Sequence, residues 1–321
     1  MSSANTIKYL IIAGTNKAGT TAVFRYLGDH PDVSVSRQKE SRFFYRNLES
    51  NGESDDAVRA RYESQFLVKK SHSLLRVEAT PTYLHGGNKI ASRIHEIVPD
   101  AMLLFMLRNP TDRVVSYYRS SFGQPHVATY GLDSDQFVDE AIRGCLADLS
   151  QESMLSDRQK AFRQELRVCQ YADFLPSFLQ YFPAERTHIA FFDQLQDSPS
   201  TLITNICRFS GIDPGFYDDY TFRVENRTRP HRSLRLRNLA AGMNTGLEPI
   251  LNRFPGLRRG ARHIYDFVNV NDDQVISFSA DARQRLDGYF QPWNDALHAL
   301  MLDSFPEASL PSWLQPITSE I

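Results

Sequence analysis

Long hydrophobic runs and closely spaced cysteines are both missing from this chain of 321 residues. No segment reaches the ~18 consecutive apolar residues of a membrane-spanning helix, so we expect no membrane span. The three cysteines are odd in number and widely separated, at Cys145, Cys169 and Cys207. They match no metal-ligand spacing, and they predict reduced, partly buried thiols. We therefore expect no cysteine-bound metal.

A strong charge of either sign is also missing, because the formal net charge is −2 at pH 7. This near balance gives no global attraction to nucleic acid or to a membrane surface. Residues 1–8 lack the basic segment and long apolar core of a secretory signal. Together with the cysteines, these absences predict a cytoplasmic protein. The sequence leaves the oligomeric state open.

Short apolar runs alternate with helical patterns along the chain, and 41% of the residues are hydrophobic. That alternation is typical of a parallel sheet with helices on both faces. We expect strands at 7–13, 33–36, 74–78, 101–107 and 187–192. The predicted fold is a single α/β domain over residues 1–321, with a central parallel sheet flanked by helices.

The most informative motif is a glycine-bearing turn between the first predicted strand and a helix, IIAGTNKAGTT at 11–21. Such a turn directs backbone N–H groups, a helix N-terminus and one lysine toward a common point, which favours a bound phosphate. Gly14 and Gly19 have the spacing of a Walker A loop, but Thr20 stands where that loop has its lysine, and Lys17 comes earlier. We expect a phosphate site unlike that of a nucleoside triphosphatase. Taken alone, the turn is also compatible with a purely structural connection.

A second motif follows the apolar run at 101–107. Arg108 comes directly after this strand, at the edge where open α/β sheets bind ligands. Pro110 and Asp112 suit the first turn of a helix, and Ser116 lies farther along it. A guanidinium suits bidentate contact with a phosphate, whereas Walker-type enzymes place a metal-binding aspartate near such a strand. We therefore expect a phosphate contact without a metal.

Four segments together resemble sulfotransferases that use 3′-phosphoadenosine 5′-phosphosulfate (PAPS). KAGTT at 17–21 resembles their 5′-phosphosulfate loop, and Arg108 with a serine eight residues later resembles their 3′-phosphate motif. KESRFF at 39–44 and EATPTY at 78–83 resemble the K-E-x-x-F-F and E-K-[ST]-P-x-Y segments of the heparan-sulfate-type branch. The resemblance implies a P-loop-like fold. It also implies sulfuryl transfer from PAPS to a hydroxyl or amine of a small-molecule, lipid or saccharide acceptor, with 3′-phosphoadenosine 5′-phosphate (PAP) as product and no metal.

The resemblance also implies which residues contact the nucleotide. They are Lys17, Ala18, Gly19, Thr20 and Thr21 at the 5′ end, and Arg108 and Ser116 at the 3′-phosphate. Family members close over the nucleotide with a basic loop, which corresponds here to residues 226–237. From this loop we expect Arg229, Arg232 and Ser233. A solvated basic segment is the alternative, and a nucleic-acid surface is disfavoured because no aromatic residues are interleaved to stack on bases.

By the same resemblance, Lys17 and Glu40 are the catalytic residues. Lys17 would stabilise charge on the leaving group, and Glu40, the glutamate of K-E-x-x-F-F, would be the base. A carboxylate with an ordinary pKa of ~4.3 is a weak base for an alcohol, so burial or late proton transfer must help. A surface pair of Lys39 with Glu40 is the simpler interpretation, and His85 is the rival base.

The expected acceptor site combines aromatic residues with variable loops at about 45–73 and 123–165. The substrate-binding candidates are Phe43, Phe44, Tyr83 and His85, and core packing is the alternative for each ring. Ala79 stands where glycan-modifying members commonly have a lysine, and no cysteine follows Cys207 to form their disulfide near the nucleotide loop. The missing cation argues against a polyanionic glycan and favours a smaller acceptor.

Two other functions are compatible with parts of this pattern. One is a P-loop nucleotide kinase or other phosphotransferase, and the other is a non-catalytic nucleotide-binding protein. The positions of Lys17 and Arg108 count against the kinase, and the presence of both Lys17 and Glu40 counts against the non-catalytic protein.

Overall fold

The computed structural model describes residues 7–49, 52–67, 73–122, 134–146, 156–223 and 278–315. The chain divides into two compact units. The first contains Met1–Arg113, Val168–Asn226 and Phe290–Ile321, and the second contains Val114–Arg167 and Arg227–Tyr289. The sheet lies entirely in the first unit.

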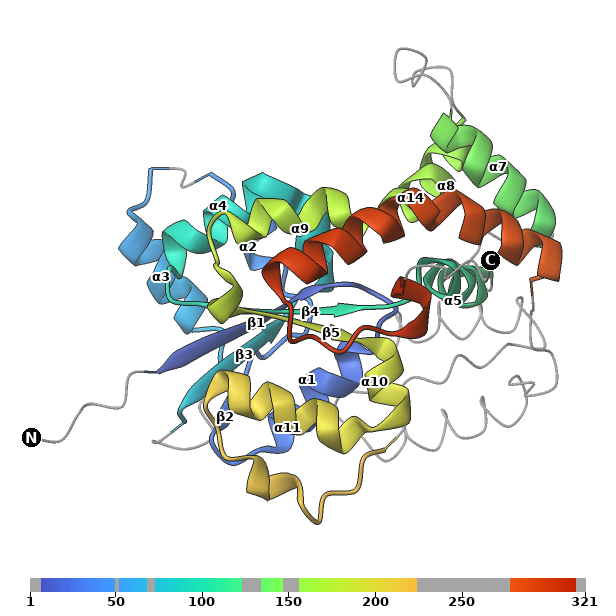
Figure 1. The fold of residues 1–321 in the computed structure, drawn as a ribbon. Coiled ribbons are helices and arrows are strands. Elements are labelled where there is room, and N and C mark those ends of the chain that lie inside the picture. The colour runs from blue at the N-terminus through green and yellow to red at the C-terminus, as the bar shows by residue number, and fades with distance from the viewer. Residues whose placement is uncertain are drawn as a thin grey trace, which may run out of the picture. The chain divides into compact units, whose positions relative to one another are not determined.

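A five-stranded parallel sheet forms the centre of the first unit (Figure 1). Its strands are β1 Lys8–Gly14, β2 Val33–Val35, β3 Leu75–Ala79, β4 Met102–Leu107 and β5 Thr187–Phe191. They lie in the order β2-β3-β1-β4-β5, and every neighbouring pair is parallel. The predicted α/β fold is confirmed, and each predicted strand is present within one residue at either end.

Alternate side chains of the central strands fill two hydrophobic cores, one on each face of the sheet. Ile11 of β1 and Leu103 of β4 belong to one core, whereas Leu10 and Leu104 belong to the other. All four side chains are fully buried. Burying one such side chain contributes about 1.5–3 kcal/mol. Burial on both faces explains why these strands are continuous apolar runs in the sequence.

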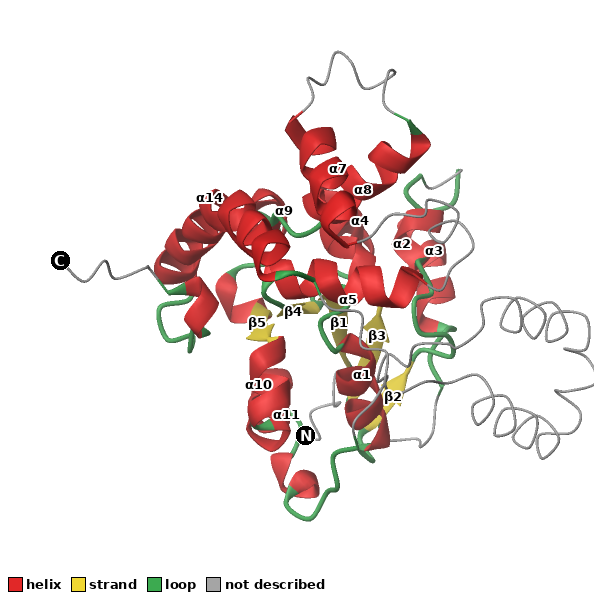
Figure 2. Ribbon diagram, turned by 90° about the vertical axis from the view of Figure 1, so that its right-hand side faces the viewer, coloured by secondary structure: helices red, strands yellow, loops and turns green. Residues whose placement is uncertain are grey.

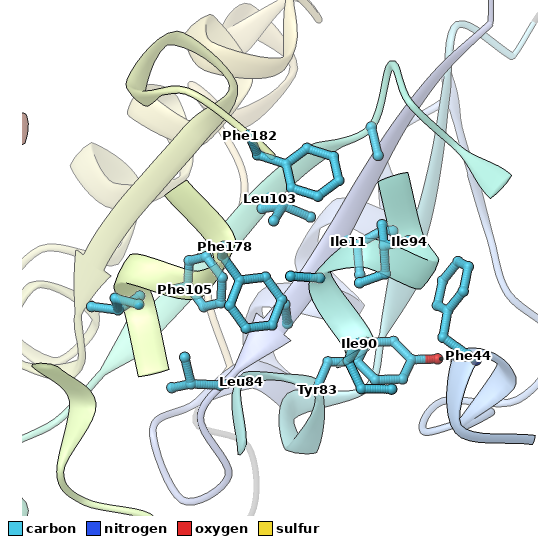
Figure 3. Close-up of a cluster of buried hydrophobic side chains, with 14 of the residues drawn as sticks. Ile11, Phe44, Tyr83, Leu84, Ile90, Ile94, Leu103, Phe105, Phe178 and Phe182 are labelled. Carbon is cyan, nitrogen blue, oxygen red and sulfur yellow. Dashed lines mark hydrogen bonds between the residues drawn. The ribbon is translucent and has the colours of Figure 1, made fainter. Parts of the chain in front are cut away.

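Helices of the first unit cover both faces of the sheet (Figures 1 and 2). Those on the face of Ile11 include α4 Gly87–Ile97 and α9 Tyr171–Leu179, and those on the other face include α1 Thr20–Asp29 and α11 Pro199–Ser210. Figure 3 shows Ile90 of α4 and Phe178 of α9 in the same core as Ile11. The turn between β1 and α1, where the sequence predicts a phosphate site, therefore joins a strand and a helix that are both packed into a core.

Shorter elements connect these layers. They are α2 Phe43–Arg46, α3 Asp55–Glu63, α10 Phe192–Asp197 and the 3₁₀ turns Pro81–Gly86, Ala184–Arg186, Pro214–Tyr217 and Ser312–Leu314. Ser54 caps α3, because its side chain accepts the Ala57 N–H at 3.3 Å. The predicted variable loop at 45–73 is thus partly helical.

The described part of the second unit is helical. Its elements are most of α5 Pro110–Phe122, all of α7 Ser134–Leu146, all of α8 Asp157–Arg167, and the start of α14 Ala280–Ser304, which continues into the first unit. Within this unit, the ring centres of Phe137 in α7 and Phe162 in α8 lie 4.5 Å apart. Helix α7 and most of α8 fall in the predicted variable loop at 123–165. None of the described helices is long and apolar enough to cross a membrane.

Candidate functional site

The glycine-bearing turn joins β1 to α1 at the carboxyl edge of the sheet. The Thr15 N–H donates to the Met106 carbonyl at 2.7 Å, which ties the start of the turn to β4. Lys17 has a φ of 66° and Gly19 a φ of 79°, so the backbone enters the left-handed region twice. A Cβ on Gly19 would lie 2.3 Å from Cδ2 of Leu195 in α10. The turn therefore requires glycine at this position for conformation and for space.

The first turn of α1 provides the features of an anion site. The N–H groups of Ala22 and Val23 donate to the Gly19 carbonyl at 2.9 and 3.2 Å, so the helix starts at Thr20. The N–H groups that precede them have no partner within the helix. The positive end of the helix dipole lies at the same point. Phosphates bind at helix N-termini of this kind.

Arg108 lies just after β4 and reaches the turn directly. Its Nη1 donates to the Lys17 carbonyl at 3.0 Å, although the two residues are 91 positions apart in the sequence. Its guanidinium carbon lies 4.2 Å from the centre of the Phe192 ring, and the Tyr171 hydroxyl donates to the Arg108 carbonyl at 2.9 Å. The structure thus brings together the two residues on which the sequence motifs centre. Ring stacking and hydrogen bonds hold the arginine in place.

A buried polar cluster contacts the same turn. Arg113 is fully buried, and it donates to Oδ1 of Asn16 and, at 3.4 Å, to the thiol of Cys169. His85 places Nε2 3.4 Å from Oγ1 of Thr15. Burial, followed by the charge of Arg113, lowers the pKa of His85 to about 3. The sequence motifs did not identify Asn16 or Arg113 as contributors to the site.

Glu40 lies on the segment that follows β2, and its side chain lines a hollow of about 450 Å³. Thr21, from the first turn of α1, lines the same hollow. The other lining residues are Gln38, Lys39, Arg42 and Arg46. The Nζ of Lys39 lies 2.9 Å from Oε1 of Glu40, so the surface pair exists beside the shared hollow. The predicted base and a predicted phosphosulfate-binding threonine therefore face one cavity.

A second glutamate, Glu78 of β3, is buried beside this segment with 1% of its surface exposed. Its carboxylate accepts hydrogen bonds from the hydroxyls of Ser41 at 2.7 Å, Thr80 at 2.7 Å, Tyr83 at 2.9 Å and Tyr62 at 3.2 Å. Burial raises the pKa of Glu78, and the hydroxyl hydrogen bonds oppose that rise. In the sequence, Glu78 is only the first residue of the EATPTY motif at 78–83. The structure makes it the centre of a hydrogen-bond network.

The predicted substrate-binding rings belong to the core in this structure. Phe43 is 6% exposed, while Phe44 and Tyr83 are fully buried in the cluster that contains Ile11. Figure 3 shows Phe44 and Tyr83 within that cluster. This burial favours core packing, the alternative considered for each ring, whereas His85 is half-buried. Contact of these four side chains with an acceptor stays a prediction.

Other predicted site residues lie outside the unit that contains the turn or outside the described residues. Ser116 is half-buried on the part of α5 that belongs to the second unit. Arg229, Arg232 and Ser233 lie, with the whole of 226–237, outside the described residues. The roles of these four residues stay predictions. Among the residues that the structure describes, no group of three or more histidines, cysteines or acidic residues could hold a metal.

The fold and the turn define a class of protein. The sheet is parallel, a P-loop-like turn follows β1, and Arg108 at the end of β4 donates a hydrogen bond to that turn. Residues 8–228 match one family model, which is described as "Sulfotransferase domain". The chain belongs to this family of enzymes, which transfer sulfuryl groups.

Individual relatives agree with the family. Bifunctional heparan sulfate N-deacetylase/N-sulfotransferase 1 of Caenorhabditis briggsae is 23% identical over 318 residues, which are 98% of this chain and 32% of the relative. Heparan sulfate glucosamine 3-O-sulfotransferase 6 of Homo sapiens is 27% identical over 63% of this chain and 52% of its own length. The chain thus spans about a third of the first relative and about half of the second.

A solved structure agrees with the fold. The sulfotransferase from Alicyclobacillus acidocaldarius superposes with a TM-score of 0.59 at 20% identity, covering 97% of this chain and all of its own. At this identity the likeness concerns the fold.

Proposed function

We propose that the chain transfers a sulfuryl group from PAPS to an acceptor hydroxyl or amine, with PAP as product. The observation that carries the proposal is the hydrogen bond from Arg108 to the carbonyl of Lys17. It joins the residue expected at the 3′-phosphate to the turn expected at the 5′-phosphosulfate. A single nucleotide that carries phosphate groups at both positions suits this arrangement.

On the donor side, the turn and the start of α1 hold the 5′-phosphosulfate through backbone N–H groups and the hydroxyls of Thr20 and Thr21. Lys17 lies beside the oxygen that bridges phosphorus and sulfur. As the bond from sulfur to that oxygen breaks, the oxygen keeps the electron pair, and Lys17 stabilises the developing charge. As in phosphoryl transfer, positioning and charge stabilisation supply most of the rate.

On the acceptor side, Glu40 takes the proton of the acceptor while the new bond to sulfur forms. Its place in one hollow with Thr21 supports this role. His85 is the weaker candidate, because its Nε2 lies 3.4 Å from Oγ1 of Thr15 and it is not among the residues that line the hollow shared by Glu40 and Thr21. Lys39 keeps Glu40 next to a positive charge in the same hollow.

The acceptor that we propose carries negative charge, and a sulfated or carboxylated saccharide is the leading class. Lys39, Arg42 and Arg46 line the hollow against Glu40 as the one acidic residue among those that line it. The relatives named above are called heparan sulfate enzymes, which agrees with such an acceptor. The absence of a lysine at Ala79 argued against a polyanionic glycan and for a smaller acceptor, but the basic residues of the neighbouring segment supply cations instead.

We further propose that residues 1–321 work as a single sulfotransferase domain and that the protein acts in the cytoplasm. The family model crosses both compact units, which supports the first point. Cys145, Cys169 and Cys207 are all free thiols, which suits a reducing compartment.

Nucleotide binding tests the proposal without any knowledge of the acceptor. We expect PAP to raise the melting temperature without metal, and Mg-ATP to leave it unchanged. A ligand at 100 times its Kd stabilises a protein by ~2.7 kcal/mol. Lys17→Ala and Arg108→Ala should each reduce the shift, whereas Lys89→Ala, on an exposed residue of α4, should keep it. If Mg-ATP alone raised the melting temperature, the sulfotransferase proposal would be wrong and a phosphotransferase would be favoured.

A further inference from the structure

The segment at 40–44, which carries Glu40, is held by hydrogen bonds to its backbone N–H groups. The four donor–acceptor pairs are Glu40 to the Ala79 carbonyl at 2.7 Å, Arg42 to Thr80 Oγ1 at 3.3 Å, Phe43 to Ser41 Oγ at 3.2 Å, and Phe44 to the Tyr83 hydroxyl at 3.2 Å. One of these acceptors is a backbone carbonyl of β3, and the other three are side-chain hydroxyls. The position of the segment therefore depends on how those three hydroxyls are oriented.

Glu78 orients all three hydroxyls. A hydroxyl has one proton, and each of these hydroxyls already uses its oxygen to accept a backbone N–H. The proton then points to Oε1 of Glu78, which receives Ser41, Thr80 and Tyr83 within 2.9 Å. One carboxylate oxygen thus fixes three hydrogen-bond relays, in each of which a hydroxyl donates to Glu78 and accepts a backbone N–H of the segment.

The segment needs such support because its backbone is strained. Glu40 has a φ of 62° and Arg42 a φ of 52°, and neither is glycine. Residues other than glycine stay in the left-handed region only where the surroundings determine it. Burial of the Glu78 carboxylate has a free-energy cost, because the charged group loses its hydration. Among the described residues Glu78 has hydroxyl partners and no ion-pair partner.

We propose that Glu78 is a positioning residue for sulfuryl transfer: through the Ser41, Thr80 and Tyr83 hydroxyls it sets the backbone of 40–44 and with it the place of Glu40. This role rests on the proposed function of Glu40 as base. Glu78 itself touches neither the donor nor the acceptor. The proposal explains why a buried glutamate stands at the end of β3, one strand away from the segment that it holds.

Two tyrosine variants separate this role from a simple loss of hydrogen bonding to Glu78. Tyr83→Phe removes a donor to Glu78 and also the acceptor of the Phe44 N–H, whereas Tyr62→Phe removes only a donor. Both side chains are buried. We expect Tyr83→Phe to speed amide hydrogen exchange in peptides that cover 40–44 by about tenfold, and Tyr62→Phe to leave it unchanged. Equal exchange in the two variants would overturn the proposal.

Substitution of Glu78 gives the second test. In Glu78→Gln an oxygen can still accept the three relays, and in Glu78→Ala none remains. We expect PAP formation from PAPS, with water as acceptor, to fall about ten- to hundredfold in Glu78→Ala and to recover largely in Glu78→Gln. The PAP Kd should be unchanged in both variants, because the Lys17 turn is intact. Thr80→Val removes a single relay and replaces Glu78→Ala if that variant does not fold.

The outcomes distinguish this inference from the proposed function. Wild-type exchange at 40–44 and wild-type turnover in Glu78→Ala, with PAP still bound, would remove the positioning role and leave the sulfotransferase proposal intact. Absence of PAP binding by the wild-type protein would remove the proposed function, while the exchange comparison would still report on what Glu78 holds.

Discussion

Gly19→Ala is the substitution that probes the phosphate turn most directly. Gly19 has a φ of 79° and immediately precedes α1. An added Cβ would lie 2.3 Å from Cδ2 of Leu195 and 3.1 Å from Cδ2 of Phe192. Phe192 is also the ring on which Arg108 stacks. A methyl group here therefore strains the backbone and disturbs the packing beside the arginine.

The expected loss of stability has two parts. A non-glycine residue in the left-handed region costs about 1–2 kcal/mol, and overpacking a well-filled interior typically costs about 1–3 kcal/mol. We expect Gly19→Ala to lower the free energy of unfolding by about 2–5 kcal/mol. We also expect weaker PAP binding, because the N–H groups at the start of α1 move with the turn.

Gly52→Ala is the matched control for the backbone part. Gly52 has a φ of 83°, and a Cβ on it would meet nothing within 4 Å. We expect it to lose about 1–2 kcal/mol and to bind PAP with the wild-type Kd. Urea unfolding followed by circular dichroism and calorimetric titration with PAP provide the two readouts. Equal losses of stability in both variants would refute the packing argument, and an unchanged PAP Kd in Gly19→Ala would refute the link between the turn and the nucleotide.

The remaining predictions concern the arginine beside the turn and two histidines. Arg108→Lys should weaken PAP binding about tenfold or more, since a lysine cannot reproduce the planar contacts to phosphate and ring. Phe192→Leu should weaken PAP binding by a factor of about two to five, because only the stacking is lost. Calorimetric titration measures both, and an Arg108→Lys variant that binds PAP with the wild-type Kd would contradict the assignment. Burial lowers the pKa of His85 to about 3 and of His188 to about 4. Because the unfolded chain protonates both rings first, stability should fall as the pH drops from about 6.5 toward 4, by about 1.4 kcal/mol per pH unit for each ring. Urea unfolding at pH 7.5 and 5.5 checks this, and equal stabilities would show that neither ring is held neutral.

The sheet could be predicted from the sequence because burial on both faces leaves a plain signal. The run at 101–107 is apolar throughout, and the residues of β4 are buried without exception. The helix α3, by contrast, lies in a segment that reads as a polar loop. Only Val58 and Tyr62 of this helix are buried, so its apolar stripe is too narrow to give a clear period.

The residues of the candidate site likewise divide into some that the sequence predicts and others that it does not. Lys17 and Arg108 could be predicted because each belongs to a motif with fixed spacing, next to a strand. Arg113 could not, since its significance depends on a buried hydrogen bond to Asn16, 97 positions away. The role of Glu78 could not be predicted either, because hydroxyl residues are common and their spacing in the sequence does not reveal which of them hydrogen-bond to one carboxylate.

Both irregular segments of the candidate site are held from a neighbouring strand. The turn follows β1, and Arg108 at the end of the adjacent β4 holds it through the Lys17 carbonyl. The segment at 40–44 follows β2, and Glu78 of the adjacent β3 holds it through three hydroxyls. Neighbouring strands lie about 4.8 Å apart, so a side chain at the end of one strand reaches the loop after the next. Each half of the site therefore has its own support. Loss of Arg108 should impair the binding of the donor, and loss of Glu78 should impair transfer while the donor still binds.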